Sequence, residues 1–210
     1  MHHYTFDDIE QADKAFRTNF VNCLSGYKSA NLVGTTDGTT SNLAIVSSVF
    51  HVGAHPPLMG ILFRPDSVAR HSLANLTQSG EYTLNAVSAQ WTDKAHQTAA
   101  RYDQDVSEFE AVGLTPEFIE PFPAPFVQES PLKIGLSVEE VTHLHCNQTI
   151  LVIGRVQHVI VHPAAVNSDG QIDLNQLDVA CVSGLDTYHR PEKVSRYAYA
   201  KPDRPVTPID

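Results

Sequence analysis

The sequence predicts a mainly β protein, a mostly antiparallel barrel with helical insertions. Runs of β-branched and aromatic residues recur along the chain, and turn signals such as Asp37-Gly38 and Pro56-Pro57 separate them. Segments with helical spacing are short and occur between groups of strands, so the order does not alternate βαβα. No G-x-G-x-x-G follows an expected strand, which removes the main support for a doubly wound nucleotide-binding fold.

Apolar residues recur at helical spacing near the start of the chain, and we expect one helix over residues 7–24. The following segments are β-type, and strands are expected at residues 31–36, 42–52, 58–63, 82–87, 132–143 and 149–161. Between them we expect a helix at residues 66–80 and short helices or folded loops at residues 89–102 and 106–114.

Residues 116–131 hold five prolines, so this segment is expected to be neither a regular helix nor a central strand. Aromatic residues such as Phe122 and Phe126 are interspersed, which predicts a surface strap that packs onto the body rather than a linker. The Pro-rich tail at residues 201–210 is expected to be an arm or to be frayed.

Length and composition limit the functional classes. A chain of 210 residues can bury a full core, and we expect a single domain over residues 1–210. The formal net charge of −10 disfavours contact with nucleic-acid phosphates or an anionic membrane surface. The first residues show no signal-peptide pattern, and no run approaches the roughly 20 apolar residues of a spanning helix. We therefore expect a soluble cytoplasmic protein that binds neither nucleic acid nor membrane.

Several common catalytic and metal-binding patterns are missing. The sequence has no G-x-S-x-G, H-E-x-x-H or G-x-x-x-x-G-K-[ST] motif. Its three cysteines are widely spaced and include no C-x-x-C pair. His143 and His145 share a face of an expected strand but have no carboxylate cluster nearby, so we predict no metal site.

The stretch from Ser41 to Gly80 carries the strongest chemical signal. One β-type run contains the small hydroxyl residues Ser47-Ser48, the next ends in Arg64-Pro65, and Arg70-His71-Ser72 opens a short helix. Small hydroxyls, a helix N-terminus and arginines together suit a phosphate monoester. Exposed backbone near small serines also suits a flat heteroaromatic ring. The alternative is that the serines lie on a polar strand face and that Ser72 is only an N-cap.

Short motifs follow one another between residues 24 and 202 in the order Asn42-Leu43-Ala44-x-x-Ser47-Ser48-x-Phe50-His51-x-Gly53, Pro56-Pro57-Leu58, Arg64-Pro65, Arg70-His71-Ser72-Leu73-x-Asn75-Leu76, Tyr82-Thr83-Leu84-Asn85, Ala95-His96-Gln97-Thr98, Ser107-Glu108-Phe109, Pro125-Phe126-Val127, Ile153-Gly154-Arg155-Val156 and Ser183-Gly184-Leu185-Asp186-Thr187-Tyr188. In their order and spacing these motifs resemble the flavin reductase-like, FMN-binding split-barrel family. No single motif is diagnostic.

The resemblance implies a split β-barrel homodimer with FMN bound near the subunit interface. It implies that the isoalloxazine edge is held by Ser47, Ser48 and the backbone at Val49, and that the phosphate is surrounded by Arg64, Arg70, His71 and Ser72. It also implies that the pocket is covered by an insertion that carries His96 and Thr98, and that Tyr188 lies near the flavin or the dimer contact. The alternatives are a hydrogen-bonded helix histidine for His96 and core packing for Tyr188.

Three functions are compatible with these motifs. The leading one is an NAD(P)H-dependent flavin oxidoreductase, in which hydride passes from the nicotinamide to N5 of the flavin. Because the flavin carries that chemistry, no catalytic side chain is required. The alternatives are an FMN-containing electron-transfer protein, similar to flavoredoxin, without efficient direct use of NAD(P)H, and a flavin-binding sensor or storage protein without turnover.

Overall fold

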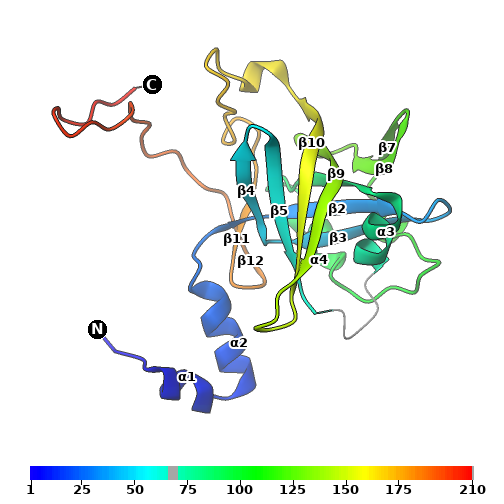
Figure 1. Cartoon of the computed structure of the whole chain (residues 1–210), viewed down its shortest axis with the longest axis horizontal. Coiled ribbons are helices and arrows are strands. Elements are labelled where there is room, and N and C mark those ends of the chain that lie inside the picture. The colour runs from blue at the N-terminus through cyan, green and yellow to red at the C-terminus, as the bar shows by residue number, and fades with distance from the viewer. Residues whose placement is uncertain (66–70, 210) are drawn as a thin grey trace.

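The computed structural model describes residues 1–65 and 71–209. Most of its regular elements are strands (Figure 1). The helices are α1 (Phe6–Gln11), α2 (Lys14–Cys23), α3 (His71–Ser79), α4 (Thr92–Gln97), α5 (Glu108–Val112) and the 3₁₀ turn Pro163–Ala165. The strands are β1 (Lys28–Ser29), β2 (Asn31–Thr36), β3 (Ser41–Val46), β4 (Val49–Ala54), β5 (Pro57–Phe63), β6 (Glu81–Ala86), β7 (Pro116–Ile119), β8 (Phe122–Val127), β9 (Leu132–His143), β10 (Ile150–Val161), β11 (Cys181–Ser183) and β12 (Thr187–His189).

Seven antiparallel strands form the central sheet, in the order β3-β2-β6-β9-β10-β5-β4. Strands β3 and β4 are the two edges of this sheet, yet only Ser47 and Ser48 separate them in the chain. The sheet must therefore curve until its edges approach each other. The Ser48 hydroxyl donates to the Leu62 carbonyl at 2.6 Å, and the Leu62 N–H donates to the Ser48 carbonyl at 3.1 Å. These two bonds extend the β4–β5 pairing by one residue before Val49. The strand content and the curved sheet confirm the predicted mainly β barrel with helical insertions.

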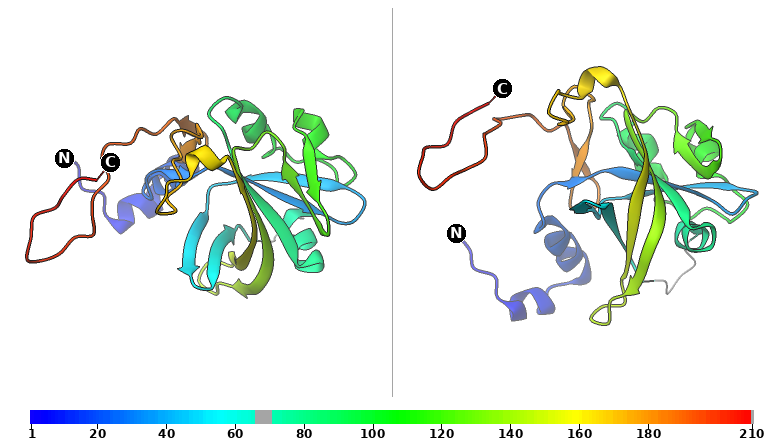
Figure 2. Two further views of the ribbon diagram at one scale, coloured as in Figure 1. Left: turned by 90° about the horizontal axis from the view of Figure 1, so that it is seen from above. Right: turned by 45° about the horizontal axis from the view of Figure 1, so that its top comes forward.

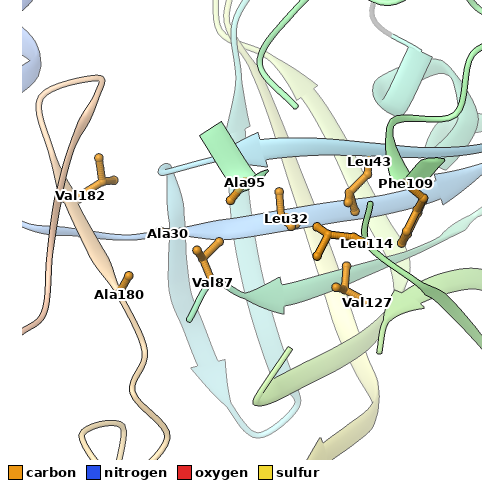
Figure 3. Close-up of a cluster of buried hydrophobic side chains, with 10 residues drawn as sticks. All are labelled: Ala30, Leu32, Leu43, Val87, Ala95, Phe109, Leu114, Val127, Ala180 and Val182. Carbon is orange, nitrogen blue, oxygen red and sulfur yellow. The ribbon is translucent and has the colours of Figure 1, made fainter. Parts of the chain in front are cut away.

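The core lies on both faces of the barrel wall, as the alternation of side chains along a strand requires. On β2, Val33 packs inside the barrel with Tyr82 and Leu136, whereas Leu32 faces outward. The outer cluster lies under the segment that carries α4 and α5, as Figure 3 shows. Its members are Ala30, Leu32, Leu43, Val87, Ala95, Phe109, Leu114, Val127, Ala180 and Val182.

The expected single N-terminal helix is wrong in one respect, because it is two helices. Asp13 accepts hydrogen bonds from the N–H groups of Ala15 and Phe16, and so caps a new helix at α2. The preceding Ala12 is extended, with ψ 151°. A polar residue such as Asp13 within an apolar periodic segment is compatible with one continuous helix or with two. Here its side-chain hydrogen bonds to the backbone start a second helix.

The expected strand over residues 42–52 is likewise two strands, β3 and β4, which turn at Ser47–Ser48. Residues 116–131 form neither a helix nor a central strand, as predicted, but they do contain two short strands, β7 and β8, which pair as a hairpin. Each strand of that two-stranded sheet has a free edge, where prolines are tolerated. The predicted packing is confirmed because Phe122 and Phe126 are buried.

The N-terminal helices and the C-terminal arm extend from one side of the barrel (Figure 2). Neither α1 nor α2 contains a buried residue. The arm folds back on itself, with the Ala198 N–H donating to the Thr207 carbonyl at 2.9 Å. Within the described ranges, no helix is long and apolar enough to cross a membrane.

Candidate functional site

The outer edge of β3 is covered by side chains of the insertion that carries α4 and α5. The Leu43 N–H donates to the Glu108 carboxylate at 2.9 Å, and the Ile45 N–H donates to the Thr98 hydroxyl at 2.9 Å. These N–H groups alternate with those directed toward β2, the partner on the other side of β3. Side chains of the insertion therefore accept hydrogen bonds from the outward N–H groups of β3 as far as Ile45.

Beyond Ile45 the chain leaves the sheet at Ser47 and Ser48. By the same alternation, Ser47 carries the next N–H group that points away from β2. Among the residues that the structure describes, none accepts a hydrogen bond from this group. Ser47, Ser48 and Val49 are half-buried, so small polar groups and backbone lie accessible where the two barrel edges meet.

The first turn of α3 packs in the same barrel core as the residues that flank the two serines. Leu73, in that turn, belongs to the barrel cluster against which Val46 and Val49 pack. His71 and Ser72 begin the helix and are half-buried. The N-terminal end of a helix offers unpaired N–H donors and a partial positive charge, which suit an anion.

The two predicted phosphate arginines differ in what the structure shows of them. Arg64 is exposed and directly follows β5, the strand whose Leu62 bonds to Ser48. Arg70 lies outside the described residues.

The insertion also contacts the small sheet β1-β11-β12 through His96 and Tyr188. The His96 Nδ1 lies 3.2 Å from the Tyr188 hydroxyl oxygen, and the two rings meet edge to face with centroids 5.7 Å apart. Burial, and secondarily the nearby Asp186 carboxylate, raises the pKa of Tyr188. The phenol therefore stays protonated at neutral pH.

Thr98 lies on the insertion, at the end of α4, and is buried there. Its side chain is 4% exposed, and its hydroxyl accepts from Ile45 and donates to the Ala95 carbonyl at 2.8 Å. Because both contacts are internal, this hydroxyl holds α4 against the strand edge and presents no exposed polar atom to a cofactor.

Ser47, Ser48 and Val49 thus lie at the turn between the two barrel edges, and Arg64 lies two residues beyond Leu62, which bonds to Ser48. His71 and Ser72 begin the helix whose Leu73 packs in the barrel core. His96 and Tyr188 lie on the insertion side of the turn, linked to β3 through α4. Three buried polar residues of the same motifs, Asn42, Asn75 and Glu108, were not predicted as site residues. The sequence feature that could have indicated them is a polar residue at a position where the hydrophobic pattern predicts a buried side chain.

The described residues contain no group of three or more His, Cys, Asp or Glu side chains placed to hold a metal ion. His143 ends β9, and His145 lies in the following turn rather than on the strand. His143 instead borders a mostly apolar cavity of about 400 Å³ between α3 and the ends of β9 and β10.

Residues 24–173 match the family model described as the flavin reductase like domain. The chain belongs to this family. A solved structure from Shewanella frigidimarina NCIMB 400, described as a candidate flavin reductase with a split barrel domain, is 48% identical to this chain. The match covers 95% of this chain and 100% of that one, with a TM-score of 0.92. The resemblance to the flavin reductase-like split barrels is thereby confirmed.

Two more distant solved structures share the fold of this flavin reductase-like chain. Flavoredoxin of Desulfovibrio vulgaris (Miyazaki F) is 22% identical, over 85% of this chain and 92% of its own, with a TM-score of 0.70. The FMN-binding protein from Thermus thermophilus is 16% identical, over 93% of this chain and 100% of its own, with a TM-score of 0.71. A curated relative from Aquifex aeolicus (strain VF5) is 31% identical over 91 residues, and the match spans 46% of that relative's length.

Proposed function

We propose that this chain is an FMN-binding oxidoreductase that uses NAD(P)H to reduce the flavin. The observation that carries the proposal is the outward Ser47 N–H, which has no acceptor among the described residues and directly follows the edge groups that Glu108 and Thr98 satisfy. A planar ring with carbonyl and nitrogen acceptors along one edge is a suitable partner for such a donor. The family membership of the chain supports the flavin as that ring.

The residues present fit FMN in two places. The Ser47 and Ser48 segment, with the backbone at Val49, would hold the pyrimidine edge of the isoalloxazine. The helix start at His71 and Ser72, with Arg64 and Arg70, would hold the phosphate. When bound, the flavin supplies the atom that accepts hydride, and the protein supplies its position and electrostatic surroundings.

The chain's own groups have defined tasks in this proposal. The Ser47 N–H donates toward the ring edge where negative charge grows on reduction, and so favours the reduced ring. The protonated Tyr188 phenol and His96 close the insertion side and limit access of water. No side chain needs to act as a general acid or base, because hydride transfer to flavin moves no proton from the protein.

We also propose that the functional form is a homodimer. Apolar side chains in the N-terminal helices and at the end of α2 remain exposed, including Phe6 at 75% and Leu24 at 65%. Phe16 and Phe20 stack on this same segment with ring centroids 5.4 Å apart. Soluble monomers rarely leave a contiguous apolar surface of this kind open, and a second copy of the chain would cover it.

A flavoredoxin-like electron carrier is the second candidate, favoured by the similarity in fold to flavoredoxin. Steady-state oxidation of NADH and NADPH with added FMN separates the candidates. Turnover supports the reductase. Reduction of the bound flavin only by a reduced protein partner supports the carrier, and neither reaction supports a sensor or storage protein.

A further inference from the structure

Four polar side chains lie buried between helix α3 and helix α5 of the insertion. Thr35, Asn42, Asn75 and Glu108 are 0%, 2%, 6% and 8% exposed, and they come from β2, β3, α3 and α5. Polar groups removed from water destabilise a protein unless they are hydrogen-bonded. Their contacts therefore explain why these positions are not apolar.

The four side chains form one connected network. The Asn75 amide donates to the Asn42 side-chain oxygen at 2.8 Å and lies 3.4 Å from the Thr35 hydroxyl. The Asn42 amide in turn donates to Glu108 at 3.4 Å. The Glu108 carboxylate oxygen that accepts from the Leu43 N–H also accepts from the Asn42 NH₂ group, so the Asn42 oxygen faces Asn75. The network runs from α5, across β3, to α3.

This network sets the position of α3 in a way that apolar packing does not. Leu73 and Leu76 press α3 onto the barrel, but such contacts have no direction and permit small slides and rotations. A hydrogen bond to the buried Asn42 depends on distance and angle. We infer that Asn75 is a positioning residue, which holds the first turn of α3 in place relative to Ser47 and Ser48 and so aligns the phosphate of FMN with its ring.

The inference rests on the proposed function, and two flavins test it. Riboflavin has the same ring as FMN but lacks the phosphate, so the ratio of its Kd to that of FMN reports the phosphate contacts alone. In Asn75→Ala we expect this ratio to fall about tenfold, comparable to the loss of one hydrogen bond to a charged group. The Kd for riboflavin should change by less than about twofold, since the ring contacts persist.

Thr77→Ala is the matched control on the same helix. The Thr77 hydroxyl donates to the Leu73 carbonyl within α3 and links no second element. Its removal should leave the ratio unchanged. A second test variant, Asn75→Asp, keeps the shape of the side chain. The titrations are made at a pH at which the new carboxyl is ionised, because burial raises its pKa. The ionised Asp has no N–H to donate to the Asn42 oxygen, so the ratio should fall again.

The outcomes separate the inference from the proposed function. If the wild type binds neither FMN nor riboflavin, the proposed function fails and the inference fails with it. If the wild type binds FMN more tightly but the ratio is unchanged in folded Asn75→Ala or Asn75→Asp, only the inference is overturned. An equal weakening of both flavins, or a wild-type ratio near one, also overturns it. Thermal unfolding of each variant shows whether it is folded at the titration temperature. If Asn75→Ala is unfolded there, the result for Asn75→Asp tests the inference.

Discussion

At the scale of single residues, the Tyr82 hydroxyl is a polar group placed inside the barrel without a hydrogen-bond partner in the described part of the chain. The side chain is 0% exposed. An ideal Cβ on Gly154 would lie 2.2 Å from this oxygen, so the glycine provides the space that the phenol occupies. Burial raises the pKa of Tyr82, which keeps the hydroxyl neutral. The group costs stability rather than adding to it.

We expect Tyr82→Phe to leave the free energy of unfolding unchanged or to raise it, because no hydrogen bond is lost. Gly154→Ala should lower that free energy by about 1–3 kcal/mol through overpacking. In the double variant part of this loss should return, since the closest atom is gone. Urea denaturation of the four proteins measures these differences. A Tyr82→Phe protein that is less stable by more than about 1 kcal/mol would show that the hydroxyl has a partner, such as a buried water.

At the scale of elements, the insertion acts on the edge of β3 through side chains. Thr98→Ala would leave the partly buried Ile45 N–H without its acceptor, and we expect a loss of about 1 kcal/mol, the low end for such donors. We expect the Ile45 amide to exchange its proton faster with solvent, as measured by hydrogen–deuterium exchange. Thr98→Ser keeps the hydroxyl and is the control. Equal protection in Thr98→Ala and the wild type would contradict this account of the strand edge.

The β2–β3 hairpin gives a prediction for pH. Hydrogen bonds from the Thr40 N–H, and from the Thr39 hydroxyl and N–H, hold the pKa of Asp37 down at about 2. Because the folded pKa is lower than the unfolded value of 3.8, this stabilisation is present above about pH 4 and is lost as the pH falls toward 2. NMR titration of the carboxyl should show the low pKa, and Asp37→Asn should reduce the dependence of stability on pH in that window. A titration midpoint near 3.8 would contradict the hairpin geometry.

The elements also show how far sequence patterns reach. The long strand over residues 132–143 was predicted with its bounds, since β-type residues and turns mark it on both sides. The break at Ser47–Ser48 was not, because the run continues through it and only the closure of the barrel interrupts the strand. The serines and the helix start of the site were predicted from motifs. The Asn42, Asn75 and Glu108 network was not, because its members lie 33 and 66 residues apart and meet only in the folded chain.

At the scale of the whole molecule, the proposed homodimer explains why the N-terminal helices extend from the barrel with apolar residues uncovered. We expect a mass in solution of twice the chain mass of 23.1 kDa, measured by light scattering during gel filtration. Replacing Phe16 and Phe20 with Ser should shift the protein toward the monomer at a given concentration. Phe118→Ser is the control, since Phe118 is 53% exposed on the β7–β8 hairpin. A wild-type mass equal to one chain at micromolar concentration would contradict the dimer.

The visible absorption spectrum tests the central claim most directly. It is recorded on the purified protein, then after addition of FMN and, without oxygen, of NADH or NADPH. We expect bands at ~370 and ~450 nm that change on binding, followed by loss of the ~450 nm band when the nicotinamide is added. A bound flavin that stays oxidised would contradict the reductase and favour the carrier. A protein that neither contains flavin nor binds it on titration would contradict the account of the site as a whole.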